Sequence, residues 1–183
     1  VSHIDSPRLD LKANPVHEQD GIVYFRTHYY GGIKKYQWTC IPLALIGVVY
    51  TKDGKKVDIN IGLKDDDPIF YVSDLLIHMA QDQMKKTLAE GITGEQLQAI
   101  AGTNAEEDLK PKEVFMKMLK DTYGIEEEDF AAAELELVPA TKSRDVGFDR
   151  SLIASYGQDD RVCSYANLEA ILQAKPGVKT QAA

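Results

Sequence analysis

Residues 43–61, with the sequence LALIGVVYTKDGKKVDINI, decide the fold of the middle of this chain. Two largely apolar runs, 43–50 and 56–61, flank a short polar segment whose Asp-Gly pair is a strong signal for a β-hairpin. In the second run every other residue is apolar, which places one face of a strand inward and the other in water. The stretch therefore predicts two antiparallel strands and a β-rich central region.

Further strand and helix signals lie on both sides of this hairpin. Strands are predicted at 22–30, ending in a glycine pair that permits a sharp turn, and at 130–138. Helices are predicted at 73–89, 112–123 and 160–173. Residues 1–19 are expected to be the end of a strand running into a long connection, and residues 90–110 a loop with a short helical turn. The predicted fold class is α/β, with helices and strands mixed.

Composition narrows the class of protein. The 183 residues are 44% hydrophobic and 27% charged, as in ordinary soluble globular proteins. The formal net charge of −8 argues against binding to nucleic acid or to an anionic membrane. The two cysteines are too few for a disulfide framework, and no leader or apolar run of about 20 residues is present, so a cytoplasmic location is expected. The chain lacks an initiator Met, so its natural N-terminus is expected to be missing.

Candidate metal ligands lie near both ends of the chain. His3 and Asp5 are two positions apart on an extended segment, so their side chains share one face. The imidazole can then bind a metal ion while the carboxylate orients the ring. Asp159 and Asp160 open a predicted helix, where one carboxylate can cap the helix and the other can turn into a site or bridge two ions. Each pattern has a simpler interpretation, since His-x-Asp triplets are common and acidic residues favour helix starts.

Other candidates favour structural roles by spacing alone. His78 lies in an apolar segment and is more typical of a partly buried histidine than of a ligand. Cys163, on a predicted helix, is more typical of a core residue. The acidic run 126–129 lacks the pattern of a calcium loop and is interpreted as a solvated turn.

Four separated segments, in order along the chain, add a family resemblance. They are SHIDSPRL (2–9), YYGGIKKYQW (29–38), RDVGFDRSLI (144–153) and YGQDDRVC (156–163). Together they resemble the aspartyl aminopeptidase and vacuolar aminopeptidase I family of dinuclear zinc metallopeptidases, especially its bacterial members.

The resemblance implies an α/β/α zinc-peptidase catalytic domain interrupted by a β-rich dimerisation domain. Residues 1–12 and 149–183 would then be catalytic-domain segments, and residues 13–148 the inserted dimerisation domain. It also implies a large homo-oligomer, a dodecamer built from dimers, and two Zn²⁺ ions per subunit.

The resemblance also assigns roles to single residues. His3 matches a zinc ligand, Asp5 the residue that orients it, and Asp160 the carboxylate that bridges both zinc ions. His78 resembles a histidine that reaches into the active site of the neighbouring subunit.

The expected function is that of a zinc aminopeptidase, which removes N-terminal residues from peptides by two-metal hydrolysis. The family has further ligands and a general base, a Glu-Glu pair, a carboxylate and a His, beyond the point where this chain ends. The fragment alone is therefore expected to be inactive. An alternative from another class is an inactive oligomerisation or assembly module, and a third is a binding domain without metal chemistry.

Overall fold

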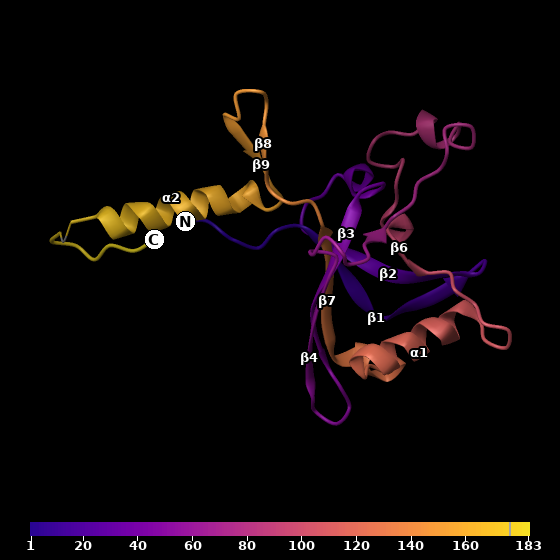
Figure 1. Ribbon diagram of the computed structural model, residues 1–183. Coiled ribbons are helices and arrows are strands. Elements are labelled where there is room, and N and C mark those ends of the chain that lie inside the picture. The colour runs from indigo at the N-terminus through magenta and orange to yellow at the C-terminus, as the bar shows by residue number, and fades with distance from the viewer. Residues whose placement is uncertain (176) are drawn as a thin grey trace. The chain divides into compact units, whose positions relative to one another are not determined.

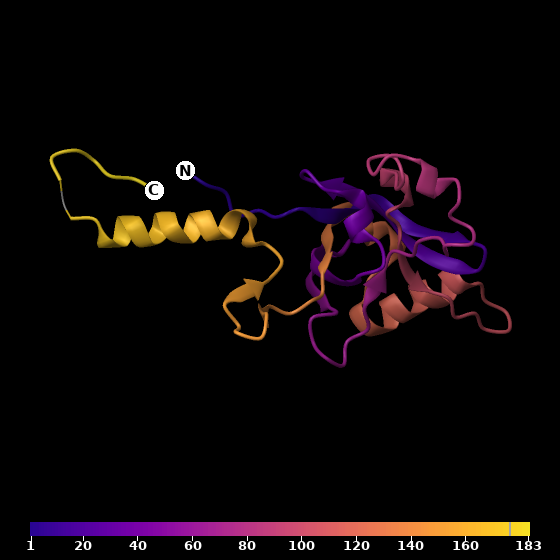
Figure 2. The ribbon, with the colours of Figure 1, turned by 90° about the horizontal axis from the view of Figure 1, so that it is seen from above.

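The computed structural model describes residues 1–175 and 177–183, which form two compact units. The terminal unit combines Val1–Pro7 with Lys142–Ala183, and the central unit is Arg8–Thr141 (Figures 1 and 2). Both divisions fall a few residues earlier than the expected domain limits at 12/13 and 148/149. Strands and helices are mixed in the chain, as the predicted fold class requires.

The central unit is built around a seven-stranded antiparallel sheet that closes on itself. Its strands are β1 (Arg8–Gln19), β2 (Ile22–Tyr30), β3 (Pro42–Tyr50), β4 (Lys56–Ile61), β5 (Phe70–Tyr71), β6 (Ala99–Gly102) and β7 (Ala133–Pro139). The strand order is β4-β3-β5-β6-β2-β1-β7, and a further pairing of β3 with β7 completes the ring. One helix, α1 (Pro111–Tyr123), accompanies the sheet, together with the 3₁₀ helices η1 (Lys35–Trp38), η2 (Gln83–Lys85), η3 (Gly94–Gln96) and η4 (Glu127–Ala132).

The predicted hairpin at 43–61 is confirmed as β3 and β4. Tyr50 pairs with Lys56 and Val49 with Val57, so the strands meet in the register that the apolar alternation requires. The turn is closed by a hydrogen bond from the Thr51 amide to the Lys55 carbonyl at 2.9 Å, and Gly54 takes a positive φ of 84°. That conformation favours glycine, which explains the Asp-Gly signal.

Gly47 marks the closest approach of two strands in the ring. It lies opposite Leu135 of β7 with φ of 135°, and a Cβ there would lie 1.9 Å from the Glu134 carbonyl oxygen. Only glycine fits, so this position lets β3 hold β7 and close the sheet.

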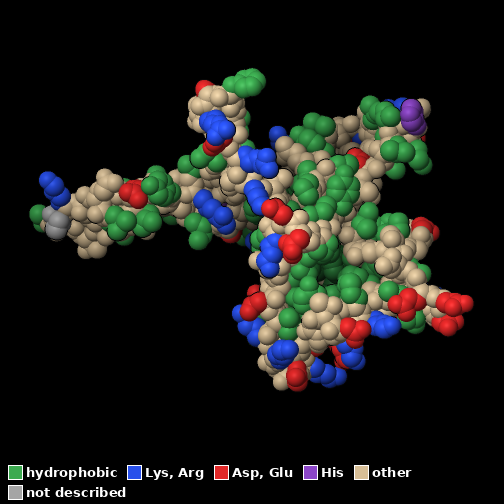
Figure 3. Space-filling view, in the orientation of Figure 1, with side chains coloured by type: hydrophobic (Ala, Val, Ile, Leu, Met, Phe, Trp, Pro, Cys, Tyr) green, Lys and Arg blue, Asp and Glu red, His purple; other side chains and the backbone are tan. Residues whose placement is uncertain are grey.

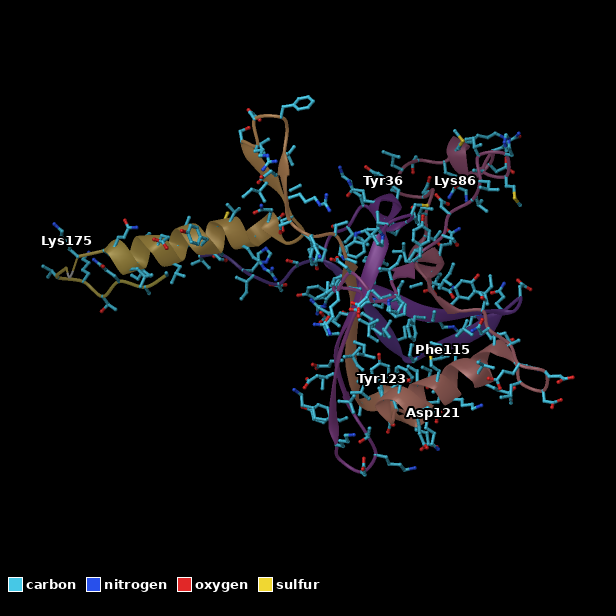
Figure 4. The ribbon with its side chains drawn as sticks, viewed as in Figure 1. Tyr36, Lys86, Phe115, Asp121, Tyr123 and Lys175 are labelled. Atoms are coloured by element: carbon cyan, nitrogen blue, oxygen red, sulfur yellow. The ribbon has the colours of Figure 1, made fainter. Side chains whose placement is uncertain are left out.

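The core inside this sheet is aromatic at its centre. Phe25 of β2 is 1% exposed, and its ring lies 5.6 Å from that of Phe70, 5.7 Å from that of Phe115 and 6.5 Å from that of Phe130, between centroids. Phe115 comes from α1, and Figure 4 shows it directed to the strands while Asp121 of the same helix points away. The amphipathic helix predicted at 112–123 is thus confirmed, and Gly124 ends it in the left-handed conformation.

Asp129 joins the β3–β4 turn to η4. Its carboxylate is buried and accepts hydrogen bonds from the backbone amides of Lys52 and Glu126, both at 2.8 Å. Asp129→Ala leaves two amides without their acceptor, so we expect the free energy of unfolding to fall by about 2–3 kcal/mol. Urea unfolding measures the loss, with Glu128→Ala as the exposed neighbouring control. Equal stabilities of the two variants would contradict this role.

Two sequence predictions are wrong in the central unit. Residues 73–89 form no α-helix but turns and the short η2. Leu75, Leu76 and Met79 would share one face of a helix, but they are exposed here, and a helix without a surface to pack against loses most of its stabilisation. The long connection predicted within residues 1–19 is instead the strand β1, which covers residues 8–19. Its buried Pro15 coincides with a register shift between Leu11 and Val16, where a bulge accommodates proline.

The terminal unit contains a short hairpin and a helix. The helix predicted at 160–173 is confirmed as α2 (Gln158–Gln173). The hairpin, β8 (Arg144–Val146) and β9 (Leu152–Ala154), was not predicted, and neither was β6 in the region 90–110. Strands of three and four residues are too short to show a periodic pattern. No helix within the described residues combines the length and apolar character that crossing a bilayer requires.

Candidate metal centre

The first residues of the chain are held against α2 by side-chain hydrogen bonds within the terminal unit. The Ser2 and Ser164 hydroxyls are 2.8 Å apart, and Ser164 Oγ also donates to the His3 carbonyl at 2.8 Å. The Tyr156 hydroxyl donates to the Pro7 carbonyl at 2.6 Å. Two motifs more than 150 positions apart in the sequence are therefore brought together.

The His3 ring is oriented by Asp5. His3 Nδ1 lies 3.0 Å from the Asp5 carbonyl oxygen and 3.2 Å from its Oδ1. Two acceptors on one ring nitrogen favour the tautomer with the proton on Nδ1. The lone pair then remains on Nε2, which is the form that binds a metal ion.

The two aspartates at the start of α2 face different partners. Asp159 Oδ1 lies 3.9 Å from His3 Nε2, and its side chain is 97% exposed. Asp160 Oδ2 instead accepts a long hydrogen bond of 3.4 Å from the His3 backbone amide. A hydrogen bond with the Cys163 thiol lowers the pKa of Asp160 and raises that of the thiol. Both aspartates have non-helical backbone angles, and the peptide bond between them is cis.

His3 and Asp159 face each other at nearly the distance of two zinc ligands. Two atoms that each lie about 2.0–2.1 Å from one zinc ion are at most about 4.2 Å apart. A tetrahedral zinc ion holds two such ligands about 3.4 Å apart, so the 3.9 Å between Nε2 and Oδ1 must shorten by about 0.5 Å for both to bind one ion. Within residues 1–175 and 177–183, no group of three or more His, Cys, Asp or Glu side chains is arranged to hold a metal ion, so the chain offers a partial ligand set.

The remaining site candidates lie in different places. His78 is exposed in the central unit, between β5 and β6. Cys163 is exposed and is not part of a disulfide, so its expected burial in the core is wrong for this chain. Asp159 was not singled out over Asp160 by the sequence, because the direction of each carboxylate depends on backbone angles that the residue types do not specify.

Comparison with known proteins identifies the family. The family model described as "Aminopeptidase I zinc metalloprotease (M18)" matches residues 1–182. The chain belongs to the M18 family. This confirms the resemblance that the four sequence segments indicated.

Bacterial M18 proteins are similar along nearly the whole chain. A "probable M18 family aminopeptidase 1" of Clostridium acetobutylicum is 51% identical over 98% of the chain, and one of Thermotoga maritima is 51% identical over 96%. The crystal structure of the Thermotoga maritima M18 aminopeptidase superposes with a TM-score of 0.88 at 50% identity over 96% of the chain. The chain spans only 39% of the length of these relatives.

A more distant solved structure shares the fold. The Saccharomyces cerevisiae mApe1 dodecamer superposes with a TM-score of 0.61 at 17% identity, over 93% of this chain and 37% of that one. At such an identity the likeness concerns the arrangement of the backbone alone.

Proposed function

We propose that this chain is part of a zinc aminopeptidase that removes N-terminal residues from peptides. The observation that carries the proposal is the His3 ring, which Asp5 orients so that Nε2 is directed to the carboxylate of Asp159. Membership of the M18 family supports the reaction class.

In this proposal each residue of the chain has a separate task. His3 would supply a neutral nitrogen ligand, Asp5 would keep the proton on Nδ1, and one carboxylate of the Asp159–Asp160 pair would hold both zinc ions. The direction of the side chains favours Asp159 for the bridge, while Asp160 holds the His3 backbone. When bound, zinc lowers the pKa of a water molecule and polarises the scissile carbonyl.

The remaining ligands are proposed to lie outside these 183 residues. A zinc site takes about four ligands, and the described residues offer two. The relatives are longer than the chain, which covers 39% of their length. The Glu-Glu pair and the His that the resemblance implies, one Glu serving as general base, are proposed for that further part.

The first experiment is to measure zinc content and peptide hydrolysis for the full-length protein and for this chain. We expect about two zinc ions per subunit and cleavage of aminoacyl substrates for the full-length protein, and neither for the 183 residues alone. A full-length protein without zinc and without activity would overturn the proposal.

A second candidate function is assembly through the central unit. The segment 75–88, here called the arm, exposes large hydrophobic side chains. The label Lys86 in Figure 4 marks the position of the arm, and Figure 3 shows hydrophobic side chains on the surface there. The most exposed are Leu76 at 70%, Met79 at 71%, Met84 at 66% and Leu88 at 72%. Such a patch on a folded surface is typical of an interaction site.

We propose that the partner of the arm is a second copy of the chain, within a homo-oligomer that is dodecameric. The distant yeast relative was solved as a dodecamer. His78 lies in the arm, so the same contact would bring it to the active site of the neighbouring subunit. The free cysteines Cys40 and Cys163 favour a cytoplasmic location for this assembly.

Charging the arm is expected to break the assembly. In the full-length protein, Leu76→Glu combined with Met79→Glu places carboxylates in the proposed contact, and light scattering should show a shift from the oligomer to smaller species. Tyr50→Glu, at an exposed position in the β3–β4 hairpin, is the control and should leave the mass unchanged. An arm variant with the mass of the unmodified protein would contradict the proposed contact.

A further inference from the structure

The β8–β9 hairpin of the terminal unit holds two arginines around one hollow. The hollow is shallow and open to solvent, with a volume of about 670 Å³. Its lining residues are Ser143, Arg144, Asp145, Gly147, Arg150 and Ile153. Two guanidinium groups face one carboxylate there, so the hollow carries a local excess of positive charge in a chain whose net charge is −8.

Neither Arg144 nor Arg150 forms a strong ion pair. Arg150 Nη1 lies 3.7 Å from Asp145 Oδ2, with side chains 78% and 50% exposed. An ion pair that is long and exposed contributes little. Among the residues that the structure describes, Arg144 has no carboxylate partner. Both guanidinium groups are therefore available to an anion, and their planar fork matches the two oxygens of a carboxylate.

The turn of the hairpin fixes Arg150 in an uncommon backbone conformation. Arg150 has φ of 53°, and its amide donates to the Gly147 carbonyl at 3.2 Å. A bulky residue rarely takes a positive φ without a compensating contact. The turn thereby places Arg150 against the same hollow as Arg144, which lies at the start of β8.

The hairpin leads directly to the candidate metal centre in the same unit. Gln158, which precedes Asp159, donates from Nε2 to the Ile153 carbonyl at 3.4 Å. Figure 1 shows the hairpin extending away from the start of α2. Arg144 pairs with Ala154, the end of β9 that leads to Asp159, and Arg150 lies at the turn, about one strand length or 10 Å further out. The two long side chains reach the hollow from opposite ends of the hairpin. An extended peptide covers about 10 Å with three residues, so a short peptide can run along the length of the hairpin.

We infer that Arg144 and Arg150 form a second binding site for the peptide substrate, which takes a carboxylate on the part of the peptide that follows the cleaved bond. The inference rests on the proposed aminopeptidase function. The carboxylate belongs either to an acidic side chain or to the C-terminus of a short peptide, since both present the same two oxygens to the arginines.

The test compares three pentapeptides that share their first residue. One is neutral with an amidated C-terminus, one has a free C-terminal carboxylate, and one is amidated with Glu at position four. Hydrolytic KM is measured for the zinc-loaded full-length protein and for Arg144→Gln and Arg150→Gln. Calorimetric Kd is measured for the same three proteins with zinc removed, so that the peptides are not cleaved during the titration. Lys175→Gln, beyond the far end of α2 (Figure 4), is the control that removes the same charge elsewhere in the unit.

We expect the unmodified protein and the Lys175→Gln variant to bind at least one carboxylate-bearing peptide about tenfold more tightly than the neutral one. Both arginine variants should lose most of this preference. The peptide that shows the preference identifies the source of the carboxylate, and the zinc content of each variant reports that its metal site is intact.

An equal preference in the unmodified protein and in both arginine variants, or no preference in the unmodified protein, would overturn the inference. Absence of hydrolysis of all three peptides would count against the aminopeptidase proposal instead, and the Kd values would still decide whether the arginines bind a carboxylate.

Discussion

Replacing Asp159 by Asn in the full-length protein is expected to lower kcat/KM for peptide hydrolysis by about 1,000-fold. Asp159 Oδ1 faces His3 Nε2 at 3.9 Å, and its side chain is 97% exposed, so the carboxylate is free to bind zinc. An amide keeps the shape but loses the negative charge that holds zinc in the proposed site. A metal ion stabilises the transition state by several kcal/mol, and about 4 kcal/mol corresponds to the stated factor. Zinc content should fall together with the rate.

Asp160→Asn is the matched comparison, because it makes the same change one residue away. Asp160 accepts from the His3 amide and binds the Cys163 thiol, so its loss should disturb the position of the ligand without removing one. A loss of about 10–100-fold is expected, as for residues that orient metal ligands. If Asp160→Asn abolished zinc binding while Asp159→Asn retained it, the bridging carboxylate would be Asp160, as the family resemblance implies.

Most of the sheet was predictable because its strands carry their own signals. The hairpin of β3 and β4 was evident from apolar alternation and one Asp-Gly turn, and α1 from its apolar face between Pro111 and Gly124. The strand β1 was missed because Pro15 signals a break, and only the register of β2 shows that the break is a bulge. Local sequence does not contain that register.

In the arm, the sequence predicted a buried helix that the structure does not contain. The run of apolar residues around His78 looks like a buried helix, yet the side chains are exposed. Their burial would come from a partner, and an intrachain pattern cannot distinguish a core from an interface.

The candidate site was predictable in kind but not in detail. His3 and Asp5 were recognised because residues two apart on an extended segment share a face, and the hydrogen bonds around Nδ1 agree with that. The choice between Asp159 and Asp160 could not be predicted, because the backbone at the start of α2 departs from helical angles at both residues. The hollow at Arg144 and Arg150 was also missed, since it depends on a hairpin too short to predict.

Phe25→Ala is expected to lower the free energy of unfolding by about 4 kcal/mol, the largest stability effect of a single substitution that we predict. Phe25 is 1% exposed, and its ring contacts those of Phe70, Phe115 and Phe130, which come from β5, α1 and η4. Removing it leaves a cavity where three elements meet, and such losses in packed cores are typically about 3–5 kcal/mol. A domain is stable by only about 5–15 kcal/mol, so the effect is a large share of the total.

Urea unfolding of the 183-residue chain measures this change through Trp38, the single tryptophan, which is 7% exposed and therefore reports on the core. Phe148→Ala is the control, because that side chain is fully exposed at the β8–β9 turn and should change stability by about 0.5 kcal/mol or less. A loss below about 1 kcal/mol for Phe25→Ala would mean that the aromatic cluster is not tightly packed, because only a site that collapses around the missing ring tolerates its removal. A loss near the expected value would instead show that the core around Phe25 stabilises the closed sheet of the central unit without any further part of the protein, because the measurement uses the 183 residues alone.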